Sequence, residues 1–283
     1  MLWCMSRNTP KATAIGGRIR AARQATGKGL REVARGLGID HSKLSRYENG
    51  ERVPPVTELA SILGYLGVNG EEREDALRMA EDPESSSWLA VGLPEQRLQT
   101  AALIETEGLS SNITDVAPLV IPGLLQIGDY VRGILRAAGA PPEEIATRVA
   151  VRVGRSEVLT RSHSPVQFTA FIGEAALRNH IGGPEVMARQ LEHLLVMGAR
   201  PNINLHVFKI GTDWHPGLDG PVVLLTIDKA TTVVFLENRR SGLFLQGEED
   251  VAAYKTAVEK VRRVSLDPVQ STEFIEDVAK QMR

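Results

Sequence analysis

The segment GIDHSKLSRYENG, residues 38–50, constrains the fold more than any other stretch of this chain. Gly38 tolerates the left-handed backbone conformation with which a helix can end in a short turn. Asp40 is suited to the N-cap position, where its carboxylate accepts the unpaired N–H groups of a following helix. The segment therefore predicts a tight turn that leads into a helix over residues 41–49.

The two faces of helix 41–49 differ in chemistry. Leu44 and Tyr47 lie three positions apart and therefore face the same, inner side. The opposite side carries four polar or basic residues, His41, Ser42, Lys43 and Arg46. Side chains of these types on an exposed helix face can meet base edges or phosphates of duplex DNA.

Apolar residues at helical spacing predict four more helices around this one. They cover residues 15–25, residues 30–37, a stretch that starts at Pro54 and Pro55 and carries apolar residues up to Leu66, and residues 71–80. Helices 30–37 and 41–49 with the turn between them form a helix-turn-helix. We therefore expect an all-α N-terminal domain in which five short helices enclose one small core.

Residues 14–68 resemble the phage-repressor-like, or XRE-type, family of helix-turn-helix domains, which has five helices. The resemblance implies that this domain binds double-stranded DNA. Carried over by position, the base-contacting residues are His41, Ser42 and Arg46, and the phosphate-contacting residues are Lys43, Asn49 and Arg52.

Two positions depart from the pattern of that family. Gly29 stands where the family usually has a capping Ser or Thr, and Leu30 stands where it often has a phosphate-binding Gln. We therefore expect backbone N–H groups and the nearby Arg31 to hold a phosphate at the start of helix 30–37.

Charge separates the two ends of the chain. Residues 1–70 contain 11 Lys and Arg against 5 Asp and Glu, a balance of +6, and residues 71–283 contain 22 against 30, a balance of −8. A basic domain attracts the DNA backbone, and an acidic remainder limits that attraction to one end of the chain. The alternative for the basic domain is a dimerisation or protein-binding module whose charged face is only solvated.

A chain of 283 residues, 42% of them hydrophobic, is long enough for two domains. The polar stretch EDPESSSW follows Ala80, and apolar periodicity resumes only near Leu98. We therefore expect a helix-turn-helix domain over residues 1–80, a linker over 81–96 and a second domain over 97–283.

The single cysteine, Cys4, excludes a disulfide framework and a thiolate metal site, and it fits a reducing compartment. No apolar run reaches the roughly 18 residues that a membrane span needs. The first residues lack the basic flank of a signal peptide. We therefore expect a cytoplasmic protein that does not cross a membrane.

The second domain alternates helical and strand patterns. Helices are predicted over residues 101–109, 123–138, 142–160, 174–179, 184–199, 248–264 and 272–281, and strands over 166–172, 203–208, 222–227 and 232–237, with 242–245 as a fifth. Residues 228–231 form the turn of a predicted hairpin. These patterns predict an α+β domain with a mostly antiparallel sheet covered by helices.

Nearly all of residues 95–280 resemble the actinobacterial domain of unknown function that follows a helix-turn-helix in antitoxin-like regulators of the Scr type. The resemblance rests on IPGLLQIGDY at 121–130, R-x-x-R at Arg152 and Arg155, FIGEAALRNHIGG at 171–183, QLEHLL at 190–195, PNINLHV at 201–207 and VVFLEN at 233–238. Ser156 departs from the family, which commonly has Gln there. The resemblance implies a small protein partner encoded by a neighbouring gene, and it implies no chemistry and no cofactor.

The residues of the second domain indicate no metal site. Its histidines show neither a helical pair four positions apart nor a cluster with cysteine. A polar cluster at the sheet has five candidate members, Arg152, Arg155, Glu174, Arg178 and Glu237. Structural ion pairs and the lining of a ligand pocket are both open interpretations of this cluster.

These features favour a sequence-specific DNA-binding regulator that forms a homodimer and receives a signal from a small protein partner through its second domain. The alternative is a regulator whose second domain senses a small molecule, which would require a pocket with a few convergent polar groups. An enzyme fused to a DNA reader is a third hypothesis. No residues at catalytic spacing support it, so we expect no enzymatic activity.

Overall fold

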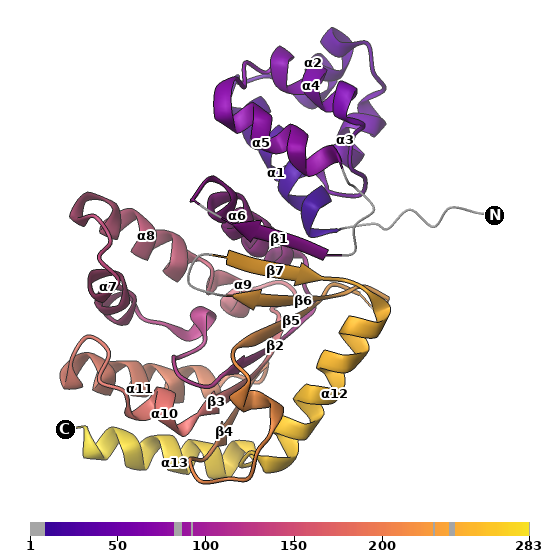
Figure 1. Cartoon of the computed structure of the whole chain (residues 1–283). Helices are drawn as coiled ribbons and strands as arrows, with labels where there is room; N and C mark the ends of the chain where they lie inside the picture. The colour runs from indigo at the N-terminus through magenta and orange to yellow at the C-terminus, as the bar shows by residue number, and fades with distance from the viewer. Residues whose placement is uncertain (1–8, 82–86, 92, 229, 238–240, 283) are drawn as a thin grey trace. The chain divides into compact units, whose positions relative to one another are not determined.

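The computed structural model describes residues 9–81, 87–91, 93–228, 230–237 and 241–282 (Figure 1). Cys4 lies outside them. The chain divides into two compact units, residues 1–109 with 235–248, and residues 110–234 with 249–283. Within the predicted linker, residues 87–91 form strand β1 (Ser87–Val91), and α6 (Leu93–Leu109) starts before the linker's predicted end and belongs to the first unit.

The first unit contains the five predicted helices, so the prediction of an all-α helix-turn-helix part is confirmed. They are α1 (Pro10–Ala25), α2 (Leu30–Leu37), α3 (His41–Glu48), α4 (Val56–Tyr65) and α5 (Gly70–Glu81). Helix α1 begins at Pro10 rather than at Ile15, because the Thr9 hydroxyl caps it by accepting the N–H of Ala12 at 3.0 Å. Proline at the first helical position suits this start.

One apolar core holds these helices together. Its buried side chains come from all five helices and include Ile15, Ile19, Val33, Leu44, Tyr47, Leu59, Ile62, Leu63 and, from α5, Ala76. Helix α6 packs against α1, where Arg20 and Glu105 form an ion pair at 3.6 Å. In the same unit the strand order is β1-β7-β6, and β1 pairs with β7 (Ser241–Leu245) in antiparallel fashion.

The second unit is built on a mixed sheet with the strand order β6-β5-β2-β3-β4. The strands are β2 (Asn112–Ala117), β3 (Gln167–Gly173), β4 (Ile203–Phe208), β5 (Val222–Thr226) and β6 (Thr232–Glu237), of which the last begins in this unit. Strand β3 pairs in parallel with β2 and β4, whereas β2 pairs with β5 in antiparallel fashion. Strands β5, β6 and β7 follow one another both in the chain and in the sheet, too close in sequence for the long crossover that a parallel pair needs, so the strands are mostly antiparallel, as predicted.

Helices cover this sheet. They are α7 (Gly128–Ala137), α8 (Pro142–Gly154), α9 (Glu157–Thr160), α10 (Glu174–Arg178), α11 (Pro184–Gly198), α12 (Glu248–Val264) and α13 (Pro268–Gln281), with short 3-10 turns η1 (Gly123–Leu125) and η2 (Pro216–Leu218). Helices α11 and α13 pack against each other and against β4 (Figure 1). Within the part of the chain that the structure describes, no helix is long and apolar enough to cross a membrane.

Two predicted helices are each divided in the structure. The helix predicted over 123–138 breaks at Gln126, which has the extended angles φ −80° and ψ 134°. The buried Gln190 of α11 stabilises this break, because its Oε1 accepts the N–H of Ile127 at 2.8 Å and its Nε2 donates to the carbonyl of Leu125 at 2.7 Å. The helix predicted over 142–160 is likewise divided into α8 and α9.

Candidate nucleic-acid interface

The turn between α2 and α3 has the geometry that its sequence predicts. Gly38 adopts φ 66° and ψ 26°, which places it in the left-handed region. Asp40 Oδ1 accepts the N–H of Ser42 at 2.7 Å and the N–H of Lys43 at 3.3 Å. These backbone hydrogen bonds, that of Ser42 above all, hold the pKa of Asp40 below its ordinary value. The cap therefore defines where α3 begins and which side chains follow on its outer face.

The inner face of α3 is fixed in the core. Leu44 and Tyr47 are buried, and the Tyr47 hydroxyl donates a hydrogen bond to Glu58 Oε2 of α4 at 2.9 Å. Burial, assisted by the contact with Glu58, raises the pKa of Tyr47. The hydroxyl therefore stays protonated as a donor, and the rotation of α3 about its axis is set.

The C-terminal end of α3 is held by α1. Glu48 is only 4% exposed, and its carboxylate accepts a bidentate pair of hydrogen bonds from Arg23, at 2.7 Å from Nε and 2.9 Å from Nη2. This hydrogen-bonded contact raises the pKa of Arg23. Arg20 also donates to the backbone carbonyl of Glu48 at 2.6 Å, and a Cβ at Gly16 would lie 2.3 Å from the Tyr47 carbonyl. We call the Arg23–Glu48 pair the α1–α3 clamp.

Sequence reasoning missed this clamp. A signal for it was present, because Glu48 lies four positions after Leu44 and therefore on the inner face of α3. A carboxylate at a core position needs a cationic partner, and α1 supplies two arginines on one side.

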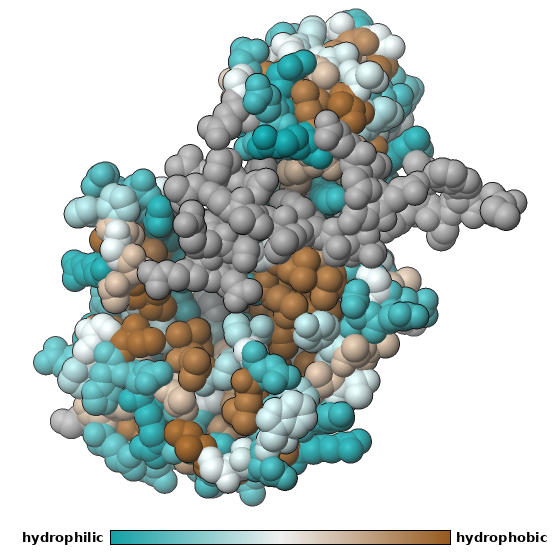
Figure 2. All heavy atoms as spheres, in the orientation of Figure 1, coloured by the Kyte–Doolittle hydropathy of each residue, from teal (hydrophilic) through white to brown (hydrophobic). Residues whose placement is uncertain are grey.

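The outer face of α3 carries the three predicted base-contacting residues. His41, Ser42 and Arg46 are all exposed. No ion pair of Arg46 is recorded among the residues that the structure describes. The visible side of the helical part is largely hydrophilic, with hydrophobic residues gathered in places among the hydrophilic ones (Figure 2). The geometry thus leaves these side chains accessible to a ligand, and their contacts with bases stay a prediction.

The predicted phosphate-contacting residues lie in different environments. Arg31, Asn49 and Arg52 are exposed, and Asn49 Oδ1 accepts a hydrogen bond from Arg20 at 3.1 Å. Gly29 caps α2 with φ −74° and ψ 154° and makes no side-chain hydrogen bond, as its lack of a side chain requires.

Lys43 is the exception, because it already has an acidic partner. Its ammonium lies 2.8 Å from Glu58 Oε1 and 5.9 Å from the centre of the Tyr47 ring. Burial alone would raise the pKa of Glu58, but the hydrogen bonds from Lys43 and Tyr47 outweigh it and lower that pKa. Lys43 therefore has to share or leave an ionised carboxylate before it can neutralise a phosphate.

Four members of the predicted polar cluster lie on α8, α10 and β6, and the fifth, Arg155, directly follows α8. Glu174 and Arg178 are brought together on α10, with Nε of Arg178 2.7 Å from Oε1 of Glu174. Glu174 Oε2 also accepts the N–H of Ile210 at 3.0 Å, so this pair anchors the chain after β4. Arg152 and Arg155 lie at the end of α8, and Glu237 ends β6.

Within the described residues, no group of three or more His, Cys, Asp or Glu side chains is arranged to hold a metal ion. His206 and His215 are buried, and burial lowers the pKa of each. The Nδ1 atom of His206 lies 2.9 Å from the carbonyl of Leu266, whereas neither ring nitrogen of His215 has a recorded partner in the described part of the chain. These histidines are spread over the second unit as single buried groups.

Two family models match this chain. A helix-turn-helix domain matches residues 14–76, and a domain of unknown function (DUF5753) matches residues 100–277, which is more than half of the chain. The protein belongs to the DUF5753 family. No curated protein matches it. The helix-turn-helix match supports DNA binding and regulation of transcription by this member of the family.

Proposed function

We propose that this DUF5753 protein is a sequence-specific transcriptional regulator of the phage-repressor-like, XRE type that acts in the cytoplasm. One observation carries the proposal. Helix α3 is capped by Asp40 and clamped by α1, buries Leu44 and Tyr47, and leaves its opposite face exposed. A short helix with an exposed polar face, within a segment (residues 1–70) of net charge +6, fits the major groove.

In this mechanism α3 enters the major groove. The Arg46 guanidinium pairs with O6 and N7 of a guanine, and His41 or Ser42 reads a neighbouring base. Arg31, Asn49, Arg52 and Lys43 contact phosphates and fix the position of the helix on the duplex.

The second part of the proposal concerns regulation. The DUF5753 part makes the protein a homodimer on two-fold symmetric half-sites, and a small protein encoded by a neighbouring gene binds this part and changes DNA affinity, as in an antitoxin-like regulator. It acts by binding and does not turn over a substrate. The resemblance to Scr-type regulators supports this assignment.

Base reading is tested with an operator selected from random duplexes. Arg46→Ala should weaken operator binding by about 1–3 kcal/mol, because a bidentate base contact is lost, and should weaken binding to random DNA much less. The matched control is Arg35→Ala, which removes another exposed arginine, from the last turn of α2, and should affect both DNAs alike. Equal losses on both DNAs for Arg46→Ala would refute the base-reading role.

Regulation is tested with the full chain and the neighbour-encoded protein. The partner should shift operator affinity by about 5- to 150-fold, and the operator should shift partner affinity by the same factor. Sedimentation should show a dimer. A monomer, or no shift in either titration, would refute the regulatory part and leave the DNA-binding part standing.

A further inference from the structure

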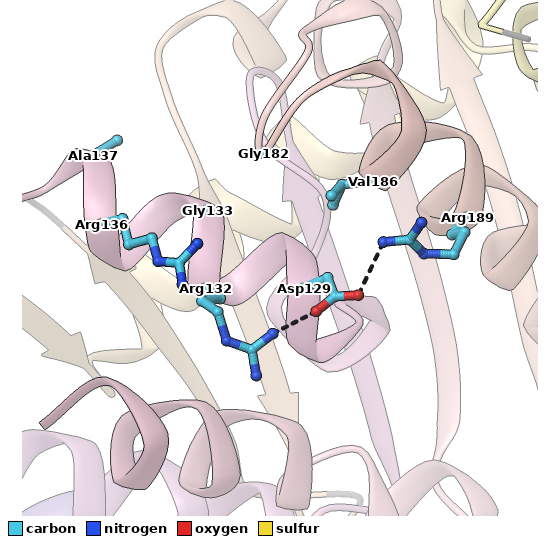
Figure 3. A pocket seen from close by; sticks show the side chains of 8 residues that line it. All are labelled: Asp129, Arg132, Gly133, Arg136, Ala137, Gly182, Val186 and Arg189. Carbon is cyan, nitrogen blue, oxygen red and sulfur yellow. Dashed lines mark hydrogen bonds and ion pairs between the residues drawn. The ribbon is translucent and has the colours of Figure 1, made fainter. Parts of the chain in front are cut away.

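A cavity of about 700 Å³ opens in the second unit between one face of α7 and the start of α11 (Figure 3). Asp129, Arg132, Gly133 and Arg136 lie on this face of α7, because positions three, four and seven apart share one side of a helix. Arg189 borders the cavity from α11. Its lining contains three arginines and one aspartate, which leaves an excess of positive charge.

Two of the residues that line this cavity are glycines. A Cβ on Gly133 would lie 2.8 Å from the Cα of Gly182, so only glycine allows α7 to come this close to the turn before α11. Gly182 itself has φ +79°, a conformation that L side chains rarely adopt. Glycine at these two positions therefore allows α7 and the turn before α11 to meet closely in the lining of the cavity.

Asp129 positions two of the three guanidinium groups. It accepts a hydrogen bond from Nη1 of Arg132 and another from Nη2 of Arg189, the latter at 2.9 Å (Figure 3). Each contact uses one of the five N–H donors that a guanidinium carries. Arg136 has no recorded ion pair among the residues that the structure describes. The cavity thus presents oriented donors that Asp129 does not occupy.

The N-terminal end of α11 adds to the positive potential of the cavity. This 15-residue helix begins at Pro184, and its cap residue Gly183 makes no side-chain hydrogen bond. The N-terminal end of a helix carries partial positive charge, and it borders the cavity through Gly182 and Val186.

We propose that this cavity binds a small organic dianion that carries a phosphate monoester or two neighbouring carboxylates. The anionic group lies against Arg136 and the remaining N–H groups of Arg132 and Arg189, because planar guanidinium forks match phosphate and carboxylate oxygens. The cavity volume falls within the range of about 300–1,000 Å³ that is usual for sites of small organic ligands.

The rest of the ligand can pack against apolar residues beside the arginines. Ala137 and Val186 line the same cavity, and a second hollow of about 490 Å³, which shares Arg132 and Arg136, continues toward Ile145. Hydrophilic and hydrophobic residues are interspersed on the visible side of this unit (Figure 2). The proposed binding does not depend on DNA recognition by the first unit.

The test is calorimetric titration of the full chain with adenosine 5′-monophosphate, succinate, inorganic phosphate and adenosine. We expect saturable binding of the monophosphate or of succinate, which distinguishes the phosphate from the carboxylate form, weaker binding of inorganic phosphate and none of adenosine. Arg136→Ala should weaken binding about tenfold or more, since a charge-assisted contact is lost. Arg136→Lys, which keeps the charge without the fork, should weaken it less.

The matched control is Arg148→Ala, because Arg148 is a similarly exposed arginine on α8 that pairs with Glu144 outside the cavity. This variant should bind as the unchanged protein does. Absence of binding by all three anions, or equal binding by the Arg136 and Arg148 variants, would overturn the proposal. It would also be overturned if Arg136→Ala left anion binding intact and reduced binding to random duplex DNA, because the arginines would then be a nucleic-acid contact.

Discussion

Glu58 restrains the predicted phosphate contact of Lys43, so Glu58→Gln should strengthen DNA binding. The Lys43 ammonium lies 2.8 Å from Glu58, and the two side chains are 44% and 18% exposed. An ion pair with this much solvent contact contributes up to about 1 kcal/mol. Releasing it should therefore raise affinity for random DNA by up to about fivefold, which is the same free energy expressed as a binding ratio.

The salt dependence gives a second, independent readout. One additional phosphate contact steepens the slope of log affinity against log salt by about 0.9. In the Glu58→Gln background, Lys43→Ala should cancel both the gain in affinity and the change of slope. In the unchanged background the same substitution should have a smaller effect than Arg52→Ala, because Arg52 is exposed and Lys43 is held by a carboxylate.

Fluorescence anisotropy with a labelled duplex at several salt concentrations measures both quantities. Glu51→Gln is the matched control, since it removes a neighbouring carboxylate, and its effect should be the same with and without Lys43. In the unchanged protein the Tyr47 hydroxyl donates a hydrogen bond to Glu58. An unaltered thermal unfolding midpoint of Glu58→Gln checks that the glutamine accepts this hydrogen bond in its place. If Lys43→Ala weakens binding equally in both backgrounds, the restraint does not exist.

Two further predictions concern stability. Arg23→Ala should lower the free energy of unfolding of the first unit by about 3 kcal/mol, because it leaves the buried Glu48 carboxylate without its cationic partner. The control Arg35→Ala removes an exposed arginine and should change this free energy little. Similar unfolding midpoints for the two variants would contradict the α1–α3 clamp. His215 is buried as the neutral form and its pKa is lowered by burial, so folding stability should fall as pH drops below the unfolded histidine value of about 6.5. His215→Phe should reduce this loss of stability at low pH, and the part that remains comes from His193 and His206, whose pKa values are also lowered. The measurement is the urea midpoint of unfolding at several pH values. The same pH dependence for the variant and the unchanged protein would exclude the role of His215.

The helix-turn-helix could be predicted from the sequence because its determinants are local. The bounds of α2 match the prediction, and α3 differs from it by one residue at its end, since Gly38 and Asp40 act on neighbours within three positions. The exposure of His41, Ser42 and Arg46 follows from helical periodicity alone once Leu44 and Tyr47 are buried.

Features that depend on distant residues were not predicted. Strand β2 contains the buried Asp115, so its sequence lacks a continuous apolar pattern. It becomes a strand by pairing with β3, more than 50 residues later in the chain, and with β5, more than 100 residues later. The break at Gln126 likewise depends on Gln190, which is far away in the sequence. The partners of Lys43 and Glu48 come from α4 and α1, and a periodicity argument shows only the side on which each residue lies.

The electrostatic contacts of the first unit differ in how salt acts on them, and this difference separates binding from folding. Phosphate contacts release counterions that are condensed on the DNA, and this release becomes less favourable as the salt concentration rises. DNA affinity therefore falls steeply with salt. The α1–α3 clamp is screened much less, since Glu48 is 4% exposed and Arg23 16% exposed at the side chain. Raising sodium chloride from about 50 to 200 mM should therefore abolish most DNA binding while the unfolding midpoint of the protein stays nearly constant. A parallel loss of both would mean that the clamp is solvated in solution and that α3 is ordered only when DNA is bound.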